Sequence, residues 1–515
     1  MPELLQGQMP SGGRPRQLCA RTVALGMLLA IDDHHPAHLV AAHRALTSLT
    51  VADQLRLGVA VVEDDGLHAV SYRQFADTHQ VMTRCIDPSP VPSFRGVEEE
   101  GRAAHLAAAR AGVDPEATRA RLWQVADALV EASVPEAYKS ASGSLAVDWT
   151  DHETFSRPRA KEDPQPSNDP DASWGHAKRN APGAKDGPFF GYYAQVATMV
   201  RSERGEEVPE LIRRIVFEAP RVDPPQAMAQ TLLRLNASGV ALGDVLSDCG
   251  YSNREPETFA VPLRAAGAAL VMDLHPNDRG PRGTFEGAVL ANGCCYCPAT
   301  PKTLLGLGPL ERGASPQKTT EHDASSAELA RYKLSPLTSP DQDGYQRFVC
   351  PAAAGKLRCA SKPASLSLSN EHPSVLFAPE APPRCCSQQS ITLPPQVNAK
   401  TAQKHDYPSK AFRLSYARRT AAERSYATLA DPATGGIRRG WSRLMGLAKN
   451  TLLYALCVIV RNVRITESYE KRKAEEARRS AMGLAPRKRR RRRRHEHATP
   501  ATSEPPPQEH PAVPG

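Results

Sequence analysis

The chain has 515 residues, 46 prolines, few aromatic residues and a formal net charge of +9. This length is enough for two or three domains with a sizeable core. Eight of the positive charges form one uninterrupted run at residues 487–494, so the rest of the chain is nearly neutral. This balance excludes a protein whose whole body is basic, and any affinity for nucleic acid must come from local patches and this run.

The cysteines and the apolar runs bear on the cellular compartment. The 11 cysteines are odd in number and unevenly spread over a long chain, which argues against a secreted disulfide framework. The apolar run 23–31 continues into Asp32 and Asp33 without a small-residue cleavage site, so we expect a buried element and not a signal peptide. The run 451–460 is about half the length needed to span a bilayer. We therefore expect a cytoplasmic protein without a membrane partner.

The first part of the chain is predicted to be helical. Thr50 and Ser71 are suitable N-caps, and Asp114 with Pro115 forms a good N-cap and first helical position. Such a group of helices is typical of a DNA-binding helix-turn-helix module, and an all-helical packing domain without DNA contact is the alternative. The predicted helices are 36–46, 51–57, 71–84, 102–111 and 115–132.

The pattern changes at Ser144, where an α/β region is predicted to begin. A short apolar run, 145–148, ends in Asp148 and is followed, after a Pro/Asp/Asn-rich loop at 157–188, by further strands and helices. The second acid, Asp248, comes directly after the short strand 243–246. This order predicts an α/β layered fold. The other predicted strands are 191–200, 211–217 and 268–274, and the helices are 226–236 and 257–266.

The last part of the chain contains a long insertion and several helices. Residues 276–405 are rich in Pro, Ser and Cys and show little periodicity. Helices are predicted at 409–429, 440–463 and 469–479, followed by the basic run and a disordered Pro-rich tail at 496–515. The predicted domains are a helical N-terminal domain (1–140), the first part of the core (141–275), the insertion (276–405), the C-terminal helices of the core (406–466) and a charged tail (467–515).

The helix at 409–429 carries a notable stripe of three side chains. Tyr416, Arg419 and Glu423 fall within roughly 60° of one another at about 100° per residue. A carboxylate, a guanidinium and an aromatic hydroxyl on one stripe suit a site that holds a metal ion against a phosphodiester. The alternative is a solvated Arg–Glu ion pair on a helix surface.

Three acids are best placed for metal chemistry. Asp148 and Asp248 follow predicted strands, and Glu423 lies on a helix that can pack against the same sheet. Three carboxylates gathered in this way repel one another unless cations neutralise them, and Mg²⁺ or Mn²⁺, as two ions, suits oxygen ligands and phosphodiester chemistry. Each acid alone could instead be a turn or cap residue. The competing acids near strand ends are Asp151, Asp244 and Asp273.

Three stretches carry a resemblance to a known family: AVDWTD (146–151), GDVLSDCGY (243–251) and SYARRTAAER (415–424). With them, the chain resembles bacterial insertion-sequence transposases of the DDE superfamily, in the group with the Tyr-Arg-Glu-Lys signature. The likeness extends over about residues 36–465 and includes FFGYY at 189–193.

The resemblance implies a ribonuclease-H-like mixed-sheet core in which Asp148, Asp248 and Glu423 are the catalytic, metal-binding residues. Tyr416 and Arg419 would hold the backbone of the transposon end. Such enzymes hydrolyse a phosphodiester at the end of the element and then join the freed 3′-hydroxyl to target DNA. The implied partners are double-stranded DNA and a second copy of the chain on that DNA, in the bacterial cytoplasm and nucleoid, with the insertion near the cleavage site.

One position departs from the signature of this group. A lysine is expected seven residues after the glutamate, and Ala430 stands there, so a phosphate contact is missing unless Arg424 or Arg438 replaces it. Two alternatives therefore stand beside transposition. One is a nuclease of the same fold that only hydrolyses DNA, and the other is a decayed or repurposed copy that binds DNA without cutting.

Seven of the cysteines lie in the insertion. Four of them, Cys297, Cys350, Cys359 and either Cys385 or Cys386, are candidates to bind one structural Zn²⁺, which would staple a segment that is poor in apolar residues. The alternative is that all of them are plain reduced thiols.

Overall fold

The computed structural model describes residues 17–35, 38–64, 66–92, 96–158, 167–177, 186–311, 313–376, 380–431, 437 and 443–485. It contains two compact units, Met1–Thr466 and Glu467–Gly515. The predictions for Arg438, the basic run 487–494 and the tail 496–515 fall outside the described residues. No helix in the described part of the chain is long and apolar enough to cross a membrane.

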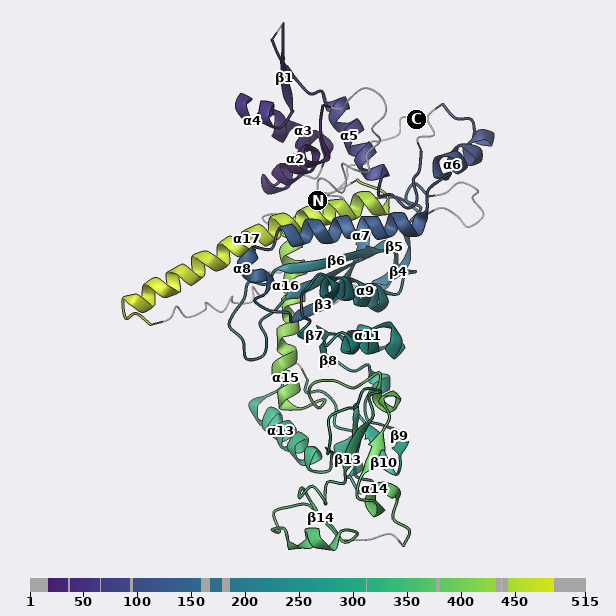
Figure 1. Ribbon diagram of the computed structural model, residues 1–515, viewed down its shortest axis with the longest axis vertical. Helices are drawn as coiled ribbons and strands as arrows, with labels where there is room; N and C mark the ends of the chain where they lie inside the picture. Colours follow the sequence, from purple (N-terminus) through teal and green to yellow (C-terminus); the bar gives the residue numbers. More distant parts are fainter. Residues whose placement is uncertain are drawn as a thin grey trace, which may run out of the picture. The chain divides into compact units, whose positions relative to one another are not determined.

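A six-stranded mixed sheet forms the centre of the first unit (Figure 1). The strand order is β4-β5-β3-β7-β8, and β6 also pairs with β5. The pairs β3–β5, β4–β5 and β5–β6 are antiparallel, whereas β3–β7 and β7–β8 are parallel. The predicted α/β class with a mixed sheet is thereby confirmed. The strands are β3 (Leu145–Glu153), β4 (Ser173–Ala177), β5 (Gly187–Met199), β6 (Ile212–Glu218), β7 (Asp244–Ser247) and β8 (Ala269–Met272).

The register between β3 and β7 places the first two acids at the same height in the sheet. Leu145 stands opposite Val245, and Ala146 stands opposite Leu246. Ser144 fixes this register, because its hydroxyl accepts a hydrogen bond from the Asp244 amide at 3.1 Å. Since side chains alternate along a strand, Asp148 points to the same face as Ala146.

Helices cover both faces of the sheet (Figure 1). Leu145, Val147 and Val245 pack in one cluster with α9 and α11, whereas Ala146 and Leu246 pack in another with the C-terminal helices. The first face carries α9 (Pro224–Ala237), α10 (Cys249–Ser252) and α11 (Ala260–Ala265), and the second carries α15 (Lys410–Tyr416), α16 (Thr420–Ala430) and α17 (Leu447–Ala481).

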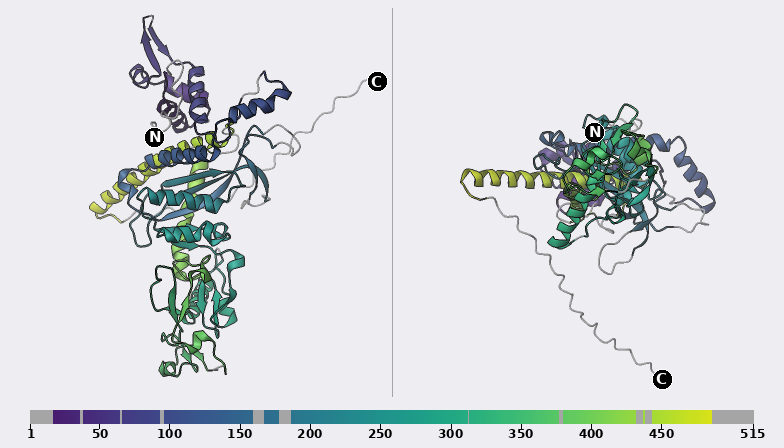
Figure 2. Two further views of the ribbon diagram at one scale, coloured as in Figure 1. Left: turned by 45° about the vertical axis from the view of Figure 1, so that its right-hand side comes forward. Right: turned by 90° about the horizontal axis from the view of Figure 1, so that it is seen from below.

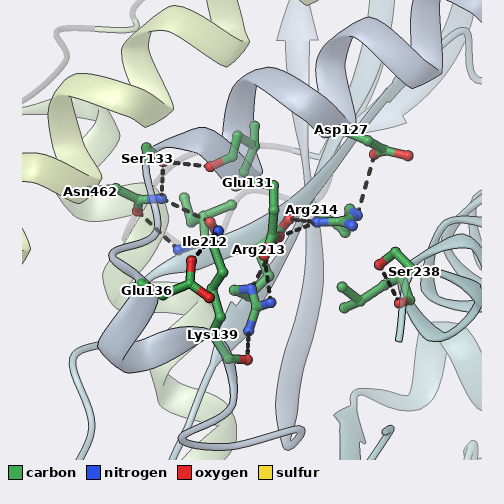
Figure 3. Close-up of polar contacts among 12 residues, drawn as sticks. Asp127, Glu131, Ser133, Glu136, Lys139, Ile212, Arg213, Arg214, Ser238 and Asn462 are labelled. Carbon is green, nitrogen blue, oxygen red and sulfur yellow. Dashed lines mark hydrogen bonds and ion pairs between the residues drawn. The ribbon is translucent and has the colours of Figure 1, made fainter. Parts of the chain in front are cut away.

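Buried polar contacts hold strand β6 between helices (Figure 3). Asn462 pairs with both backbone groups of Ile212, accepting from its N–H at 3.0 Å and donating to its carbonyl at 2.8 Å. The fully buried Arg213 and its neighbour Arg214 both donate to the carboxylate of Glu131, at 2.7 and 2.6 Å. The Asn462 contacts satisfy the backbone groups of Ile212 at the outer edge of β6, where no further strand of the described residues pairs. Figures 1 and 2 show α7 (Pro115–Ala132) beside α17 here.

The N-terminal region is helical, as predicted, with one exception. Thr50, Ser71 and Asp114 are confirmed as N-caps whose side chains accept from backbone amides. A short hairpin of β1 (Ala60–Glu63) and β2 (Gly66–Ala69) lies between the helices and was not predicted. The helices are α2 (Ala20–Asp32), α3 (Leu39–Thr47), α4 (Val51–Arg56), α5 (Tyr72–Arg84), α6 (Arg102–Arg110), α7 (Pro115–Ala132) and α8 (Glu136–Lys139).

The insertion contains three small sheets despite its lack of periodicity. Their strands have two to five residues and pair within the insertion. The sheets comprise β9 (Pro281–Phe285), β10 (Ala288–Ala291) and β11 (Cys294–Tyr296); β12 (Ser335–Pro336), β13 (Gln346–Val349) and β16 (Ile391–Leu393); and β14 (Arg358–Cys359) and β15 (Ser374–Val375). The helices are α12 (Lys302–Leu305), α13 (Pro316–Arg331) and α14 (Arg384–Ser387). Short 3₁₀ turns in the chain are η1 (Glu99–Gly101), η2 (Pro256–Thr258), η3 (Pro276–Asp278), η4 (Pro363–Ser367) and η5 (Pro395–Asn398).

Several predicted elements need correction. The strand predicted to end at Asp148 continues to Glu153, because β5 pairs with it along its whole length. The predicted loop 157–188 contains strand β4, which forms because it pairs with the first part of β5. The helix predicted at 409–429 is divided by a 3₁₀ turn, η6 (Ala417–Arg419). The helices predicted at 440–463 and 469–479 are one helix, α17, since Arg464 and Thr466 continue the helix without a breaker.

Candidate active site

The three predicted acids converge on one arginine. Arg419 Nη2 lies 3.2 Å from Asp148 Oδ2 and 3.5 Å from Asp248 Oδ2. Its Nη1 donates to Glu423 Oε1 at 2.7 Å. The carboxylates from β3, from the turn after β7 and from α16 are therefore gathered around a single guanidinium, although about 275 positions separate the first from the last.

Local hydrogen bonds orient the two aspartates toward that centre. Oδ1 of Asp148 accepts from the Trp149 amide at 2.9 Å, and Oδ1 of Asp248, the N-cap of α10, accepts from the Gly250 amide at 2.9 Å. Each residue thus uses one oxygen to fix its side chain and turns the other to Arg419. Gly250 is needed for this turn, because a Cβ atom there would lie 2.4 Å from the Trp149 ring.

Helix α16 is held against the sheet by a side chain that the sequence analysis did not identify. The hydroxyl of Tyr426 donates to the backbone carbonyl of Asp148 at 2.6 Å and can also reach that of Ala194 at 3.0 Å. Thr198 and Ser425 hydroxyls meet nearby at 2.9 Å. These contacts fix the height of Glu423 relative to Asp148. A tyrosine three residues after Glu423 was the only signal in the sequence.

The 3₁₀ turn η6 sends two neighbouring arginines to different partners. Arg418 pairs with the buried Asp244 at 2.8 Å and donates to the Arg201 carbonyl at 2.9 Å, while Arg419 faces the three acids. Asp244 also binds Lys404 Nζ at 2.7 Å. Arg418 was another omission from the predicted site, and it ties η6 to the start of β7.

The negative charges of the three acids exceed the positive charge of Arg419 between them. Burial raises the pKa of the Asp148 carboxyl to about 7; Arg419 opposes this rise, whereas the neighbouring charges of Asp248 and Glu423 add to it. The pKa of Arg419 is raised above its ordinary value, because the acidic groups around it, Asp148 foremost, outweigh the effect of its burial. One guanidinium thus faces more negative charge than it can neutralise.

The predicted DNA-contacting residues differ in their surroundings. Tyr416 stacks on Phe412, with ring centroids 5.2 Å apart, and burial raises its pKa, so its hydroxyl stays a donor. Arg424 is half-exposed and forms a forked pair with Glu210, with Nε to Oε2 at 2.9 Å. In this state Glu210 therefore occupies the guanidinium that would reach a phosphate.

The competing acids have other roles. Asp244 is bound by Arg418 and Lys404, and Asp273 is bound by Arg279 at 3.1 Å and by the Tyr407 hydroxyl at 2.9 Å. Asp151 lines a cavity of about 240 Å³ next to the site, together with Thr150, Glu153, Tyr426 and Ala430. The lysine expected by the signature would enter this cavity if it replaced Ala430.

Within the described part of the chain, no three His, Cys, Asp or Glu side chains form a group that could hold a metal ion as they are placed. At the carboxylates the reason is visible, because Arg419 occupies the position between them. Of the candidate zinc ligands, Cys297, Cys350 and Cys359 share one buried cluster of the insertion. Cys385 and Cys386 lie in the adjoining cluster.

Comparison with known proteins gives no family for this chain. No protein-family model matches it, and neither the curated proteins nor the solved structures give a match. The function inferred for the site therefore rests on its residues and their geometry.

Proposed function

We propose that this protein is a DNA transposase with a ribonuclease-H-like core. It would hydrolyse a phosphodiester at the ends of a mobile element and join the freed 3′-hydroxyl to target DNA. The observation that carries this proposal is the convergence of Asp148, Asp248 and Glu423 on Arg419. The resemblance of the three sequence stretches around these acids to DDE transposases supports it.

The donor set fits divalent cations. The three acids offer only oxygen ligands, which Mg²⁺ and Mn²⁺ prefer, and their charge exceeds what Arg419 neutralises. Asp148 Oδ2, Asp248 Oδ2 and Glu423 Oε1 are the atoms that would hold the ions. When bound, two such ions activate the attacking oxygen and stabilise the leaving one.

The residues of the chain would then have separate tasks. Asp148 gives up the proton that its raised pKa retains, so that its carboxylate becomes a ligand. Arg419, released from the carboxylates, offers its planar fork to phosphate oxygens of the DNA. Tyr416, which stays protonated, donates a hydrogen bond to the same backbone. Tyr426 and Arg418 keep the helix in position throughout.

The test uses the full chain with DNA that brackets its own open reading frame. Nicks at the two borders and joined strand-transfer products in Mg²⁺ or Mn²⁺ are expected. Asp248→Asn should abolish both, because it removes a ligand and leaves the carbonyl oxygen to accept from Gly250. Asp151→Asn is the matched control and should keep both activities. A folded wild-type protein that cuts no border in either ion contradicts the proposal.

A second candidate function is DNA binding without cleavage, favoured by Ala430 in place of the expected lysine and by the pairing of Arg424 with Glu210. Border DNA that is bound but never nicked at any divalent-ion concentration would support it. Nicks without joined products would instead indicate a nuclease that only hydrolyses.

A further inference from the structure

Four cysteines from four separate segments of the insertion lie together in its interior. Cys297 follows β11, Cys350 follows β13, Cys359 ends β14, and Cys386 lies on α14. All four are buried free thiols. The first three belong to one apolar cluster, and Cys386 adjoins it.

Three of these thiols pack in one buried cluster, and electrostatic interactions connect Cys386 with them. Burial raises the pKa of Cys297 to about 12, and the nearby Cys350, Cys386 and Cys359 add to the rise. Burial likewise raises the pKa of Cys350, again with contributions from Cys386 and Cys359. Each of these thiols is therefore close enough to the others for a negative charge on one to disfavour a charge on the next.

Backbone amides lie near two of the sulfur atoms. The Ala299 amide lowers the pKa of Cys297 against the effect of burial, and the amides of Ala352 and Ala353 act in the same way on Cys350. Tight turns place them there: Thr300 N donates to the Cys297 carbonyl at 3.0 Å, and Ala354 N donates to the Cys350 carbonyl at 3.0 Å. Amides directed at sulfur favour the thiolate over the thiol, and a thiolate is the form that binds metals.

A positive side chain lies near the fourth thiol. The pKa of Cys386 is lowered to about 7, first by the hydrogen bond with Cys385, whose sulfur is 3.9 Å away, and then by Lys362 against the effect of burial. Cys386 is thus the easiest of the four to ionise. The Lys362 charge also offsets part of the negative charge that four thiolates would bring to one ion.

The other cysteines of the insertion have different surroundings. Cys294 and Cys297 have the spacing of a Cys-x2-Cys pair, but the Cys294 thiol faces the carboxylate of Asp406 at 3.6 Å. Cys295 packs in the cluster that also holds Cys385 and Cys386. Cys385 lies against the turn at Gly287 and is near Cys297 and Cys350 as well, but the hydrogen bond with Cys386 and burial raise its pKa.

We propose that Cys297, Cys350, Cys359 and Cys386 bind one structural Zn²⁺. Burial raises the pKa of the Cys297 and Cys350 thiols, so these two carry their protons near neutral pH. Binding would release these protons, form four Zn–S bonds of about 2.3 Å and leave a net charge of −2 on the group. The ion would join β11, β13, β14 and α14, whose strands are too short to form a stable core by themselves.

The test measures zinc in the full chain, purified without chelators, by mass spectrometry of the metal. About one zinc per chain is expected. Cys350→Ser and Cys359→Ser should lose it, whereas Cys457→Ser, which changes a buried thiol of α17, and Cys294→Ser should keep it. Cobalt-loaded wild-type protein should show thiolate-to-cobalt absorption, a readout that does not depend on any variant folding.

Three results would overturn the proposal: folded wild-type protein without zinc, zinc that survives both Cys350→Ser and Cys359→Ser, or a disulfide among the four cysteines. The measurement involves no DNA. Its outcome is therefore separate from the outcome of the cleavage assay.

Discussion

The carboxylate site and the cysteine group gather their side chains in different ways. Asp148 and Asp248 are placed by the hydrogen-bonded register of β3 and β7, and Tyr426 ties Glu423 to the same sheet. Three of the four cysteines lie at the ends of strands of two to four residues, and Cys386 lies on the short helix α14. Arg419 already supplies a counter-charge to the acids, whereas burial raises the pKa of Cys297 and Cys350 and keeps these two thiols neutral.

This difference teaches what each group requires of a metal. A site built on a long sheet keeps its geometry without an ion, so the proposed ions could exchange with each round of chemistry. A group in a segment with little regular structure would depend on its proposed ion for order. A metal ion would thus be catalytic at the carboxylates and structural at the cysteines.

Removing metal should separate the two regions most strongly. After incubation with a strong zinc chelator we expect protease to cut within 276–405 first, because a zinc site of this kind contributes on the order of 10 kcal/mol to local folding. The sheet and its helices should remain as a protected core, visible by mass spectrometry of the fragments. If the protease cuts both regions at the same rate, or cuts neither region, the two groups do not differ in their need for metal.

Two adjacent arginines provide the next test. Arg418→Met should lower the free energy of unfolding by about 3 kcal/mol, since the buried Asp244 then keeps only Lys404 as a partner. Arg419→Met should also destabilise the protein, because three carboxylates then repel one another. Urea unfolding with and without Mg²⁺ distinguishes the two variants. Mg²⁺ should restore the free energy of unfolding of Arg419→Met and leave that of Arg418→Met unchanged. If Mg²⁺ restores the stability of both variants, or of neither, the prediction is wrong.

Restoring the missing lysine tests the cavity beside the acids. Ala430→Lys should place an ammonium group in the space lined by Asp151 and Glu153 and strengthen binding of border DNA by about 1.5–3 kcal/mol, the value of a charged hydrogen bond. Titrations of fluorescent DNA at two salt concentrations measure it, with Ala430→Gln as the uncharged control. If Ala430→Lys and Ala430→Gln change the affinity for border DNA equally, the charge of the lysine does not contribute to DNA binding.

The pH dependence of ion binding is the smallest expected effect. Because the pKa of Asp148 is raised to about 7, its proton competes with the ion, and Mn²⁺ affinity should fall about tenfold per pH unit below that value and level off above it. Calorimetry between about pH 5.5 and about pH 8.5 measures this dependence of the Mn²⁺ affinity on pH. Glu218→Gln removes another buried acid with a raised pKa and should leave the profile unchanged.

The same pKa has a consequence for stability without metal. The folded carboxyl of Asp148 holds its proton more tightly than the unfolded one, so its contribution to stability is full at low pH and is lost as pH rises from about 4 to about 7. Asp148→Asn should remove this slope. Zinc binding by the proposed four thiols would have the opposite sign, because a reaction that releases protons is favoured as pH rises, and it would act through groups outside the sheet.

Much of the sheet could be predicted because its signals are local. The apolar run before Asp148 and the long run at 191–200 predict β3 and β5 from burial alone, and the caps Ser71 and Asp114 fix helix starts. The hairpin β1–β2, strand β4 and the strands of the insertion escaped prediction. Their residues become strands only through partners, since runs of two to five residues have no periodicity of their own.

The sequence by itself determined which groups could act: acids at the end of short apolar runs or close behind them, a Tyr-x2-Arg-x3-Glu stripe and cysteines concentrated in one segment. Only the tertiary structure decided how they are used. It put Arg419 between the three acids, assigned Asp244 to Arg418, and placed both Cys385 and Cys386 near Cys297 and Cys350. Such partners are separated by up to about 275 positions in the chain, and residue spacing carries information only over the few turns or strands within which periodicity holds.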